Sequence, residues 1–360
     1  MGSSRDALPI SVVVVNYNGV GFLDACLGSL KEMGAPAGEV ILVDNASTDG
    51  SAAWVREHHP WVRLIQANEN LGYCGGNNLG IRASSQPFVA LLNNDTRVEP
   101  GWLENLFQEL HNRPSTAACS SLVLLPGDPP RVHYAGSQAH VLGHIANLHY
   151  LQPLPEVQAK LQAGCTGVYV GSSVLFRKAA LDEVGLLEER FFIYEDELDM
   201  SLRLRMLGWS IRFTPRSVVW HFAGTPGLAV RAPQPYPRLR AFLVTRNRWL
   251  VLLRLYRVRT LLALAPPLVL FELAWIMAMA QAGRVRQVAQ AVGWNWRHRR
   301  WVLQERKRVQ VSRTAPDSAL LVACPLSPVP GLATAGVFAT LRRGGEALIR
   351  LYWTGVRWLL

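Results

Sequence analysis

Short apolar runs alternate with longer amphipathic stretches up to about Leu125. The apolar runs, rich in β-branched and aliphatic residues, are Ile10–Val15, Val40–Val43, Val62–Ile65 and Phe88–Leu92. Buried strands have this composition, and amphipathic stretches between them are typical of the helices that connect parallel strands. The pattern predicts an α/β fold with a mostly parallel central sheet flanked by helices.

A polar segment follows each of these runs. The four segments are 16–18, 44–47, 68–70 and 93–95, and each contains Asn or Asp. Ligands of open α/β sheets bind outside the carboxyl ends of the strands. The first part of the chain therefore predicts a nucleotide-binding sheet.

The pattern weakens after this sheet and then tightens again. Residues 126–163 are rich in Pro, Gly and His, which predicts irregular strands and a mobile loop. Two further strands are predicted, Val168–Phe176 and Ile211–Trp220, the second interrupted by Pro215. Between them, Glu195–Gly208 is a predicted helix that ends at its glycine.

Two segments at the predicted strand ends carry groups suited to a nucleotide. Asp44 can accept hydrogen bonds from a base N–H or from ribose hydroxyls, and Asp49 is expected to cap the following helix. The Gly-rich segment Glu69–Ile81 leads into a helix, where glycines allow a phosphate to approach the backbone. It has neither the GK[ST] of a P-loop nor GxGxxG, so an ordinary turn remains the alternative.

Asp95 lies just beyond a buried strand. An unpaired carboxylate is costly there unless it binds a cation or hydrogen-bond donors. A hard oxygen ligand suits Mg²⁺ or Mn²⁺ bridging a diphosphate, and His221, after a later strand, can complete the metal shell if it lies near Asp95. A turn-forming aspartate and a structural histidine are the alternatives.

The segment Arg190–Trp209 is the densest in acidic residues. Its carboxylates at the start of the predicted helix are Glu195, Asp196, Glu197 and Asp199. Crowding of this kind can raise one carboxyl pKa and supply a general base. A solvated helix with i,i+4 ion pairs, such as Asp199 with Arg203, is the alternative explanation.

The last third of the chain differs from the rest in its pattern of apolar and charged residues. Leu261–Ala282 spans 22 residues with one charge, Glu272, close to the roughly 20 that cross a bilayer. Pro266 and Pro267 interrupt it, and arginines stand on both sides, so we expect a kinked hairpin or an in-plane helix with both ends cytoplasmic. Glu346–Leu360 mixes Trp, Leu and Arg as an interfacial helix does; a core or oligomer-interface helix is the alternative.

The charge balance divides the chain in two. The 360 residues carry a net charge of +11, yet residues 1–230 hold 16 Lys and Arg against 22 Asp and Glu, while residues 231–360 hold 21 against 4. An acidic first part argues against a nucleic-acid partner. The basic tail is expected to bind an anionic membrane surface.

Cysteine usage and the N-terminus suggest a compartment. Five cysteines are scattered without CxxC spacing, which predicts reduced thiols, no disulfide frame and no zinc site. The first apolar run is too short for a secretory signal. We therefore expect a peripheral or monotopic protein at the cytoplasmic face of the inner (plasma) membrane.

The ordered motifs resemble a known family. In chain order they are VVNYNG, VDNAS-DGS, N-NLG-GGNN-G, LLNND, G-S-LFR, YEDELD-SLR and WH--G-T. They resemble the family 2 glycosyltransferases with the GT-A fold, especially bacterial rhamnosyltransferase-like and galactofuranosyltransferase-like members. The resemblance covers roughly residues 9–250 and implies a catalytic domain over 1–250, followed by a basic, amphipathic, membrane-associating helical region over 251–360.

Matching motif by motif, the resemblance implies roles for single residues. The donor and nucleotide side would comprise Val14, Asn16, Asp44, Gly72, Asn77, Asn93, Asn94 and Ser172. Asp95 matches the metal-binding aspartate of the DxD-type motif; the first position is Asn93 here, so coordination rests on Asp95 and His221. Asp196 matches the catalytic base. The acceptor or leaving-group side would comprise Glu195, Asp199 and Arg203.

The reaction implied is an inverting transfer of a sugar, with rhamnose a candidate. The donor would be a nucleoside diphosphate sugar, the acceptor a cell-envelope and lipid-linked glycan, and the cofactor a divalent cation, Mg²⁺ or Mn²⁺. A sugar-phosphate nucleotidyltransferase is the second hypothesis, although VNYNGVGFL lacks the basic residue such enzymes carry after the first strand. A catalytically inactive membrane scaffold is the third, and a homo-oligomer is left open.

Overall fold

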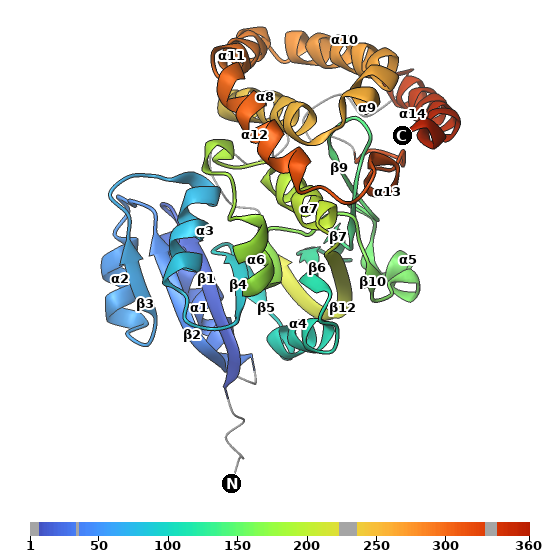
Figure 1. Cartoon of the computed structure of the whole chain (residues 1–360). Helices are drawn as coiled ribbons and strands as arrows, with labels where there is room; N and C mark the ends of the chain where they lie inside the picture. Colours follow the sequence, from blue (N-terminus) through green and yellow to red (C-terminus); the bar gives the residue numbers. More distant parts are fainter. Residues whose placement is uncertain (1–6, 34–35, 223–235, 328–336) are drawn as a thin grey trace. The chain divides into compact units, whose positions relative to one another are not determined.

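The computed structural model describes residues 7–33, 36–222, 236–327 and 337–360, with side chains from 344 onward in the last range (Figure 1). The chain divides into two compact units. Unit 1 comprises residues 1–137, 148–193 and 209–224, and unit 2 comprises residues 138–147, 194–208 and 225–360. This division is less simple than a single boundary at residue 250, which falls inside a helix of unit 2.

Unit 1 is built on a ten-stranded sheet. Its strands are β1 (Leu8–Asn16), β2 (Ala37–Asp44), β3 (Arg63–Gln66), β4 (Phe88–Asn93), β5 (Thr96–Val98), β6 (Thr116–Leu125), β7 (Arg131–Tyr134), β10 (Gly164–Cys165), β11 (Ser173–Arg177) and β12 (Ser210–His221). The order is β10-β12-β6-β11-β4-β1-β2-β3, with β5 beside β12 and β7 beside β6. A separate two-stranded sheet pairs β8 (Ser137–Ala139) with β9 (Ile145–Asn147).

The sheet is mixed. β3, β2, β1 and β4 are parallel, as the apolar runs predict. β11 is antiparallel to both of its neighbours, β4 and β6. The α/β class is confirmed, and the mostly parallel arrangement holds for the first half of the sheet, where βαβ crossovers connect the strands.

Helices pack on both faces of this sheet. They are α1 (Val20–Glu32), α2 (Ser51–His58), α3 (Gly72–Ala83), α4 (Trp102–His111), α5 (Leu154–Val157) and α6 (Lys178–Val184), with the 3₁₀ turns η1 (Gln158–Lys160) and η2 (Glu189–Phe191). Val12 and Val14 of β1 lie in the apolar core that α1 and α4 complete. Val13 and Val15 point to the opposite side, because side chains alternate along a strand.

On that opposite side, two glycines bring α3 close to β1. A Cβ at Gly80 would lie 2.3 Å from Cγ1 of Val13, and a Cβ at Gly76 would lie 2.7 Å from Cγ1 of Val15. No larger residue fits either position without a shift of the helix. Gly76, predicted to bring a phosphate close to the backbone, therefore has a packing role in the structure.

Two predicted strands differ in detail from those observed. Val168–Phe176 becomes a strand only at Ser173, because the chain turns there and the Ser173 amide donates to the Val170 carbonyl at 3.3 Å. β12 runs continuously, yet its register with β6 shifts between Thr214 and Val218. Pro215 lies inside that shift, as expected for a residue that cannot donate to a ladder.

Unit 2 is largely helical (Figure 1). Its helices are α7 (Asp196–Met206), α8 (Arg238–Leu255), α9 (Val258–Ala263), α10 (Ala265–Gln281), α11 (Val285–Arg297), α12 (Arg299–Val311), α13 (Asp317–Leu320) and α14 (Val337–Val356), followed by the 3₁₀ turn η3 (Arg357–Leu359). α8 packs against α7, α11 and α12. The predicted helix at 195–208 is confirmed as α7, and it belongs to this unit.

The long apolar segment is broken near its start. α9 ends at Ala263, and α10 begins at Ala265 with its two prolines in the first turn, where proline costs no helical hydrogen bond. The predicted interruption is therefore confirmed. Among the helices that the structure describes, none is both long and apolar enough to cross a membrane.

Part of the tail's positive charge lies inside unit 2. Arg246, Arg248 and Arg254 of α8 are buried. Nη1 of Arg254 lies 2.9 Å from Oδ1 of Asp199, and Arg248 forms an ion pair with Glu272. Arg248 and Arg254, expected to flank a membrane segment, thus neutralise carboxylates within the unit, while the Arg246 guanidinium lies over the rings of Phe242 and Trp294.

Candidate active site

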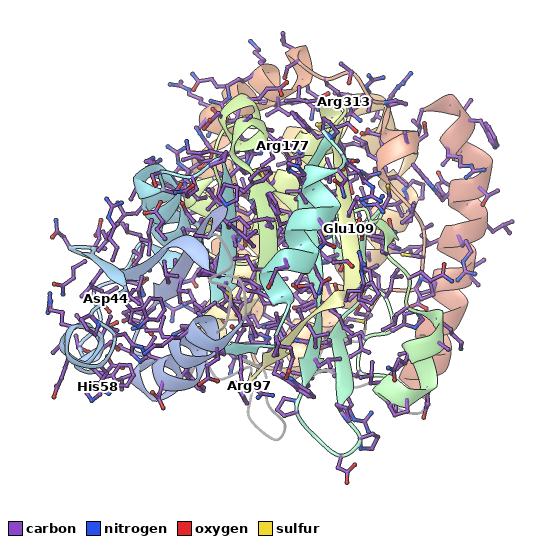
Figure 2. The ribbon with its side chains drawn as sticks, turned by 90° about the horizontal axis from the view of Figure 1, so that it is seen from below. Asp44, His58, Arg97, Glu109, Arg177 and Arg313 are labelled. Atoms are coloured by element: carbon purple, nitrogen blue, oxygen red, sulfur yellow. The ribbon has the colours of Figure 1, made fainter. Side chains whose placement is uncertain are left out.

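Polar side chains meet at the carboxyl ends of β1, β2 and β4. Asn16 is in register with Asp44, and its Nδ2 lies 3.4 Å from Oδ1 of Asp44 and 3.2 Å from Oγ of Ser47. Nδ2 of Asn94 donates to Oδ1 of Asn16 at 2.7 Å. Asp44, labelled in Figure 2, is buried. The structure thus brings Asn16, Asp44 and Asn94 together as the sequence predicts.

The loops after β1 and β2 are bonded to each other. The Thr48 amide donates to Oδ1 of Asn18 at 2.7 Å. Asp49 accepts from the Val20 amide at 2.9 Å and from the Ser51 amide at 3.1 Å, and these are the first residues of α1 and α2. The N-cap positions are Gly19 and Gly50, so Asp49 is not itself the predicted cap, yet its carboxylate bonds the first amide of both helices, where its charge is favourable.

Asn45 is a residue that the sequence predictions missed. Its Nδ2 donates to Oδ1 of Asn70 and to the Gly72 carbonyl, both at 3.0 Å, and its Oδ1 accepts from the Leu71 amide at 3.0 Å. It therefore connects the end of β2 to the start of α3. The only signal was its place beside Asp44 in the second motif.

Gly72 and Asn77 are bound into protein contacts. Gly72 has φ +70°, and a Cβ there would lie 2.5 Å from Cδ2 of Phe192. Asn77 is buried and donates to the Tyr73 carbonyl at 2.9 Å. These contacts give both residues a structural role, and their roles toward a donor stay predictions.

Gly72→Ala should destabilise the protein more than Gly50→Ala does. Both glycines have positive φ, but a Cβ at Gly50 would meet nothing within 4 Å. Gly50→Ala therefore isolates the left-handed backbone cost, about 1–2 kcal/mol, and Gly72→Ala adds the clash with Phe192. Urea unfolding of the two variants measures the difference. Equal losses of stability would show that both the ring and the backbone carbonyl of Phe192, each less than 3 Å from such a Cβ, move aside freely.

Asp95 and His221 lie side by side, as predicted. Nε2 of His221 is 3.0 Å from Oδ1 of Asp95, and both side chains are buried. Nδ1 of His221 is 2.9 Å from Nδ1 of His133 on β7, a residue that the sequence predictions missed. Burial lowers the pKa of His133 to about 3, and the neighbouring His221 acts in the same direction, so His133 is neutral near pH 7.

The donor set at this site suits a cation that brings ligands of its own. Asp95 offers a hard carboxylate oxygen and His221 an imidazole nitrogen. Within the described ranges, no group of three or more His, Cys, Asp or Glu side chains is arranged to hold a metal. Mg²⁺ and Mn²⁺ are commonly held by one or two protein ligands together with substrate phosphates and water. The site therefore fits a cation chelated by a diphosphate.

Ser172 lies beside the end of β4. Its carbonyl accepts from the Asn93 amide at 3.1 Å, and its Oγ is buried with no hydrogen-bond partner in the described part of the chain. A buried hydroxyl of this kind requires a partner such as a ligand or a water. Val14, by contrast, has its side chain fully buried in the core.

The acidic segment of unit 2 begins in a strained turn. Phe192, Tyr194 and Glu195 have φ of 65°, 72° and 59°, a region that non-glycine residues rarely adopt. The Tyr194 carbonyl accepts from Nδ2 of Asn247 at 2.8 Å, and the Arg240 guanidinium lies 4.6 Å from the Tyr194 ring centre. Strain held in place by such contacts is typical of functional sites.

Asp196 follows this turn as the first residue of α7. It is 3% exposed, and its Oδ2 has no hydrogen-bond partner among the described residues. Burial raises the pKa of Asp196 well above the ordinary value, and the carboxylate of Glu197 adds to the effect. Next to it, Oε1 of Glu195 lies 3.0 Å from Nδ1 of His144. Asp196 therefore has the burial and the raised pKa of a general base.

Asp199 and Arg203 form an internal ion pair. Nε of Arg203 donates to Oδ2 of Asp199 at 2.7 Å, the i,i+4 contact predicted from the sequence. Arg254 binds the other carboxylate oxygen of Asp199, and all three side chains are buried. These ion pairs give Asp199 and Arg203 a structural role. The acceptor or leaving-group role of Glu195, Asp199 and Arg203 stays a prediction.

Comparison with known proteins finds similarity to sugar-transferring proteins over part of the chain. Residues 11–185 match the model of the family Glycosyl transferase family 2. The N-acetylglucosaminyl-diphospho-decaprenol L-rhamnosyltransferase of Mycobacterium tuberculosis is 29% identical over 236 residues, which cover 60% of this chain and 76% of the relative. The poly-beta-1,6-N-acetyl-D-glucosamine synthase of Staphylococcus epidermidis is 22% identical over 215 residues, 59% of this chain and 49% of the relative.

Two solved structures share the fold. A crystal structure of GalNAc-T7 with UDP, GalNAc and Mn²⁺ has a TM-score of 0.55 at 16% identity and covers 71% of this chain and 49% of its own. A mannosyltransferase from Pyrobaculum calidifontis in complex with GDP-Man and Mn²⁺ has a TM-score of 0.51 at 18% identity and covers 85% and 86%. The expected GT-A type of fold is thereby confirmed.

Proposed function

We propose that this protein transfers a sugar from a nucleoside diphosphate donor to a cell-envelope glycan, a premise supported by the match of residues 11–185 to the Glycosyl transferase family 2 model. The observation that carries the proposal is the buried Asp196 carboxylate, which follows a strained turn and has an oxygen that no described residue hydrogen-bonds. The similarity to a rhamnosyltransferase and to a polysaccharide synthase supports this class of reaction.

The end of the sheet would hold the donor. Asp44 and Asn16 offer oxygen and amide groups to a base and ribose, and the hydroxyl of Ser172 is available to the sugar. Asp95 and His221 would hold a divalent cation. When bound, that cation would neutralise negative charge on the departing diphosphate. Both solved structures that share the fold contain Mn²⁺, which supports the choice of cation.

Asp196 would act as general base in an inverting displacement. The acceptor oxygen attacks the anomeric carbon as its proton passes to the Asp196 carboxylate, and the bond from that carbon to the diphosphate oxygen breaks with its electron pair leaving on the diphosphate. The raised pKa of Asp196 matches this task, because a base works best when its pKa approaches the working pH. No covalent enzyme intermediate is required.

The acceptor would be lipid-linked. The name of the Mycobacterium tuberculosis relative specifies a diphospho-decaprenol substrate and L-rhamnose, which supports a polyprenyl-linked glycan and a rhamnosyl donor here. We infer that the protein works as a peripheral or monotopic protein at the cytoplasmic face of the membrane, where its basic tail meets anionic lipid.

A panel of nucleotide sugars, each incubated with Mn²⁺ or Mg²⁺, tests this function. We expect one donor to release its nucleoside diphosphate, faster with the cation and faster still with a polyprenyl-diphosphate-linked acceptor. Release of pyrophosphate from a nucleoside triphosphate and a sugar phosphate would instead identify a nucleotidyltransferase. Failure of every nucleoside diphosphate to bind with Mn²⁺ would favour an inactive scaffold.

A further inference from the structure

α10 presents an apolar face that no described residue covers. With the neighbouring Leu262 of α9, its large exposed side chains are Val269, Leu270, Leu273, Ile276 and Met277. Leu270 is 68% exposed and Leu273 is 55% exposed. Water-facing positions of an ordinary surface helix are polar, so the apolar composition of this face disfavours its exposure to water.

The inner face of the same helix is already occupied. Trp275 and Met279 are buried in an apolar cluster with Tyr236 and Ala241. Glu272, the only charged residue of α10, pairs with Arg248 inside the unit. The inner and the outer face of α10 are therefore both apolar. A helix that is hydrophobic all round is typical of a helix buried in protein or in lipid.

The last helix lies against α9 and has exposed apolar side chains of its own. The Tyr352 hydroxyl donates to the Ala263 carbonyl at 2.6 Å, which fixes α14 against α9. α14 and η3 expose Leu348, Leu351 and Trp358, and the Arg357 guanidinium lies 4.8 Å from the Trp358 ring centre. Leucine, tryptophan and arginine on one surface are the composition of helices that lie in a membrane interface.

The charge of the unit decides what covers this surface. Unit 2 contains eight Asp and Glu against 23 Lys and Arg, and three of the acidic residues in its C-terminal part are engaged by arginines. The pairs are Glu272 with Arg248, Glu305 with Arg254 and Asp317 with Arg313. The remaining positive charge would repel a second copy of this chain and would attract an anionic lipid surface.

We propose that the outer faces of α9, α10 and α14 with η3 insert into one leaflet of an anionic bilayer without crossing it. The side chains named above would enter the boundary between headgroups and acyl chains, and arginines around them would contact lipid phosphates. The inference deepens the proposed function by assigning its membrane partner to one surface. It is tested without any sugar donor, so the failure of either is recognised separately.

Sedimentation of the full chain with lipid vesicles tests the surface. We expect binding to phosphatidylcholine vesicles that contain phosphatidylglycerol, weakening in high salt because the charge attraction is screened. Leu270→Glu with Leu273→Glu should weaken the partition by at least about tenfold for each leucine, because burying a leucine side chain is worth more than one tenfold step. Val292→Glu with Val311→Glu is the matched control, since both valines are exposed, on α11 and α12, and the two substitutions make the same charge change as the pair on α10.

Thermal unfolding and native mass measurements show whether the substitutions change the stability of the fold or the oligomeric state. All replaced side chains are largely exposed, so the variants should unfold at the temperature of the unmodified chain. Equal vesicle binding by the double variant and the unmodified chain would overturn the proposal. The proposal would also be overturned if the unmodified chain were a dimer, the double variant were a monomer and neither bound vesicles. That result would assign the apolar face to a second copy of the chain.

Discussion

Asp196→Asn should lower kcat for sugar transfer by roughly 10²- to 10⁴-fold, the range that a positioned general base contributes. Asparagine keeps the size of the side chain but cannot accept the acceptor's proton. The donor KM should change little, because the proposed nucleotide contacts come from Asn16 and Asp44. Steady-state release of nucleoside diphosphate in the presence of acceptor measures both constants.

Asp182→Asn is the matched control for this substitution. Asp182 lies on α6 with a side chain 61% exposed and 3.5 Å from Nζ of Lys178, so the control removes one carboxylate from a solvated ion pair. It should leave kcat unchanged. If Asp196→Asn keeps the rate of the control, the base is another group, and Glu195 with its buried Oε2 is the next candidate.

The pH profile distinguishes a lost base from a damaged fold. Transfer requires the Asp196 carboxylate, so the rate falls as the pH drops through its pKa. Burial, and then the charge of Glu197, raises that pKa, so the acid limb of kcat should lie above the ordinary aspartate value of about 3.9. The residual activity of Asp196→Asn should lack this limb. The variant should also unfold no more easily, because it removes a carboxyl that burial disfavours.

The sequence predicted the sheet edge well because the signals there are local. Each parallel strand is an apolar run followed at once by its polar group, as at Val15 and Asn16 or Val43 and Asp44. Strand direction is not encoded in such a run, which is why antiparallel β11 was not anticipated. The start of that strand also depends on the turn at Val170, which is set by a bond to Ser120 from another strand.

The missed residues depend on contacts between distant parts of the chain. His133 reaches His221 from 88 positions away, and nothing around it in β7 distinguishes it from an ordinary strand histidine. Arg254 was predicted as part of a positive flank, but its partner Asp199 lies 55 positions earlier. Composition counts both charges and cannot show that they cancel inside one unit.

Asp95→Asn should abolish most of the Mn²⁺-dependent gain in nucleoside diphosphate affinity. Asparagine can still accept a hydrogen bond from Nε2 of His221, now 3.0 Å from the carboxylate, so the local structure should persist while the negative charge is lost. The expected loss is at least about 10- to 100-fold, since even residues that only orient a metal ligand cost that much. Calorimetric titration with UDP and with dTDP, each with and without Mn²⁺, measures the gain directly.

The control is Asp24→Asn, which removes the same charge from a side chain 87% exposed and 3.9 Å from Nε2 of His59. It should retain the full Mn²⁺-dependent gain. Removing the cation with EDTA should lower the affinity of the unmodified chain to that of Asp95→Asn and leave the variant unchanged, because both treatments remove the same bridge to the diphosphate. If the variant still gains affinity from Mn²⁺, the cation is held by donors other than Asp95, and the site beside His221 and His133 would be a hydrogen-bonded support for the end of β12.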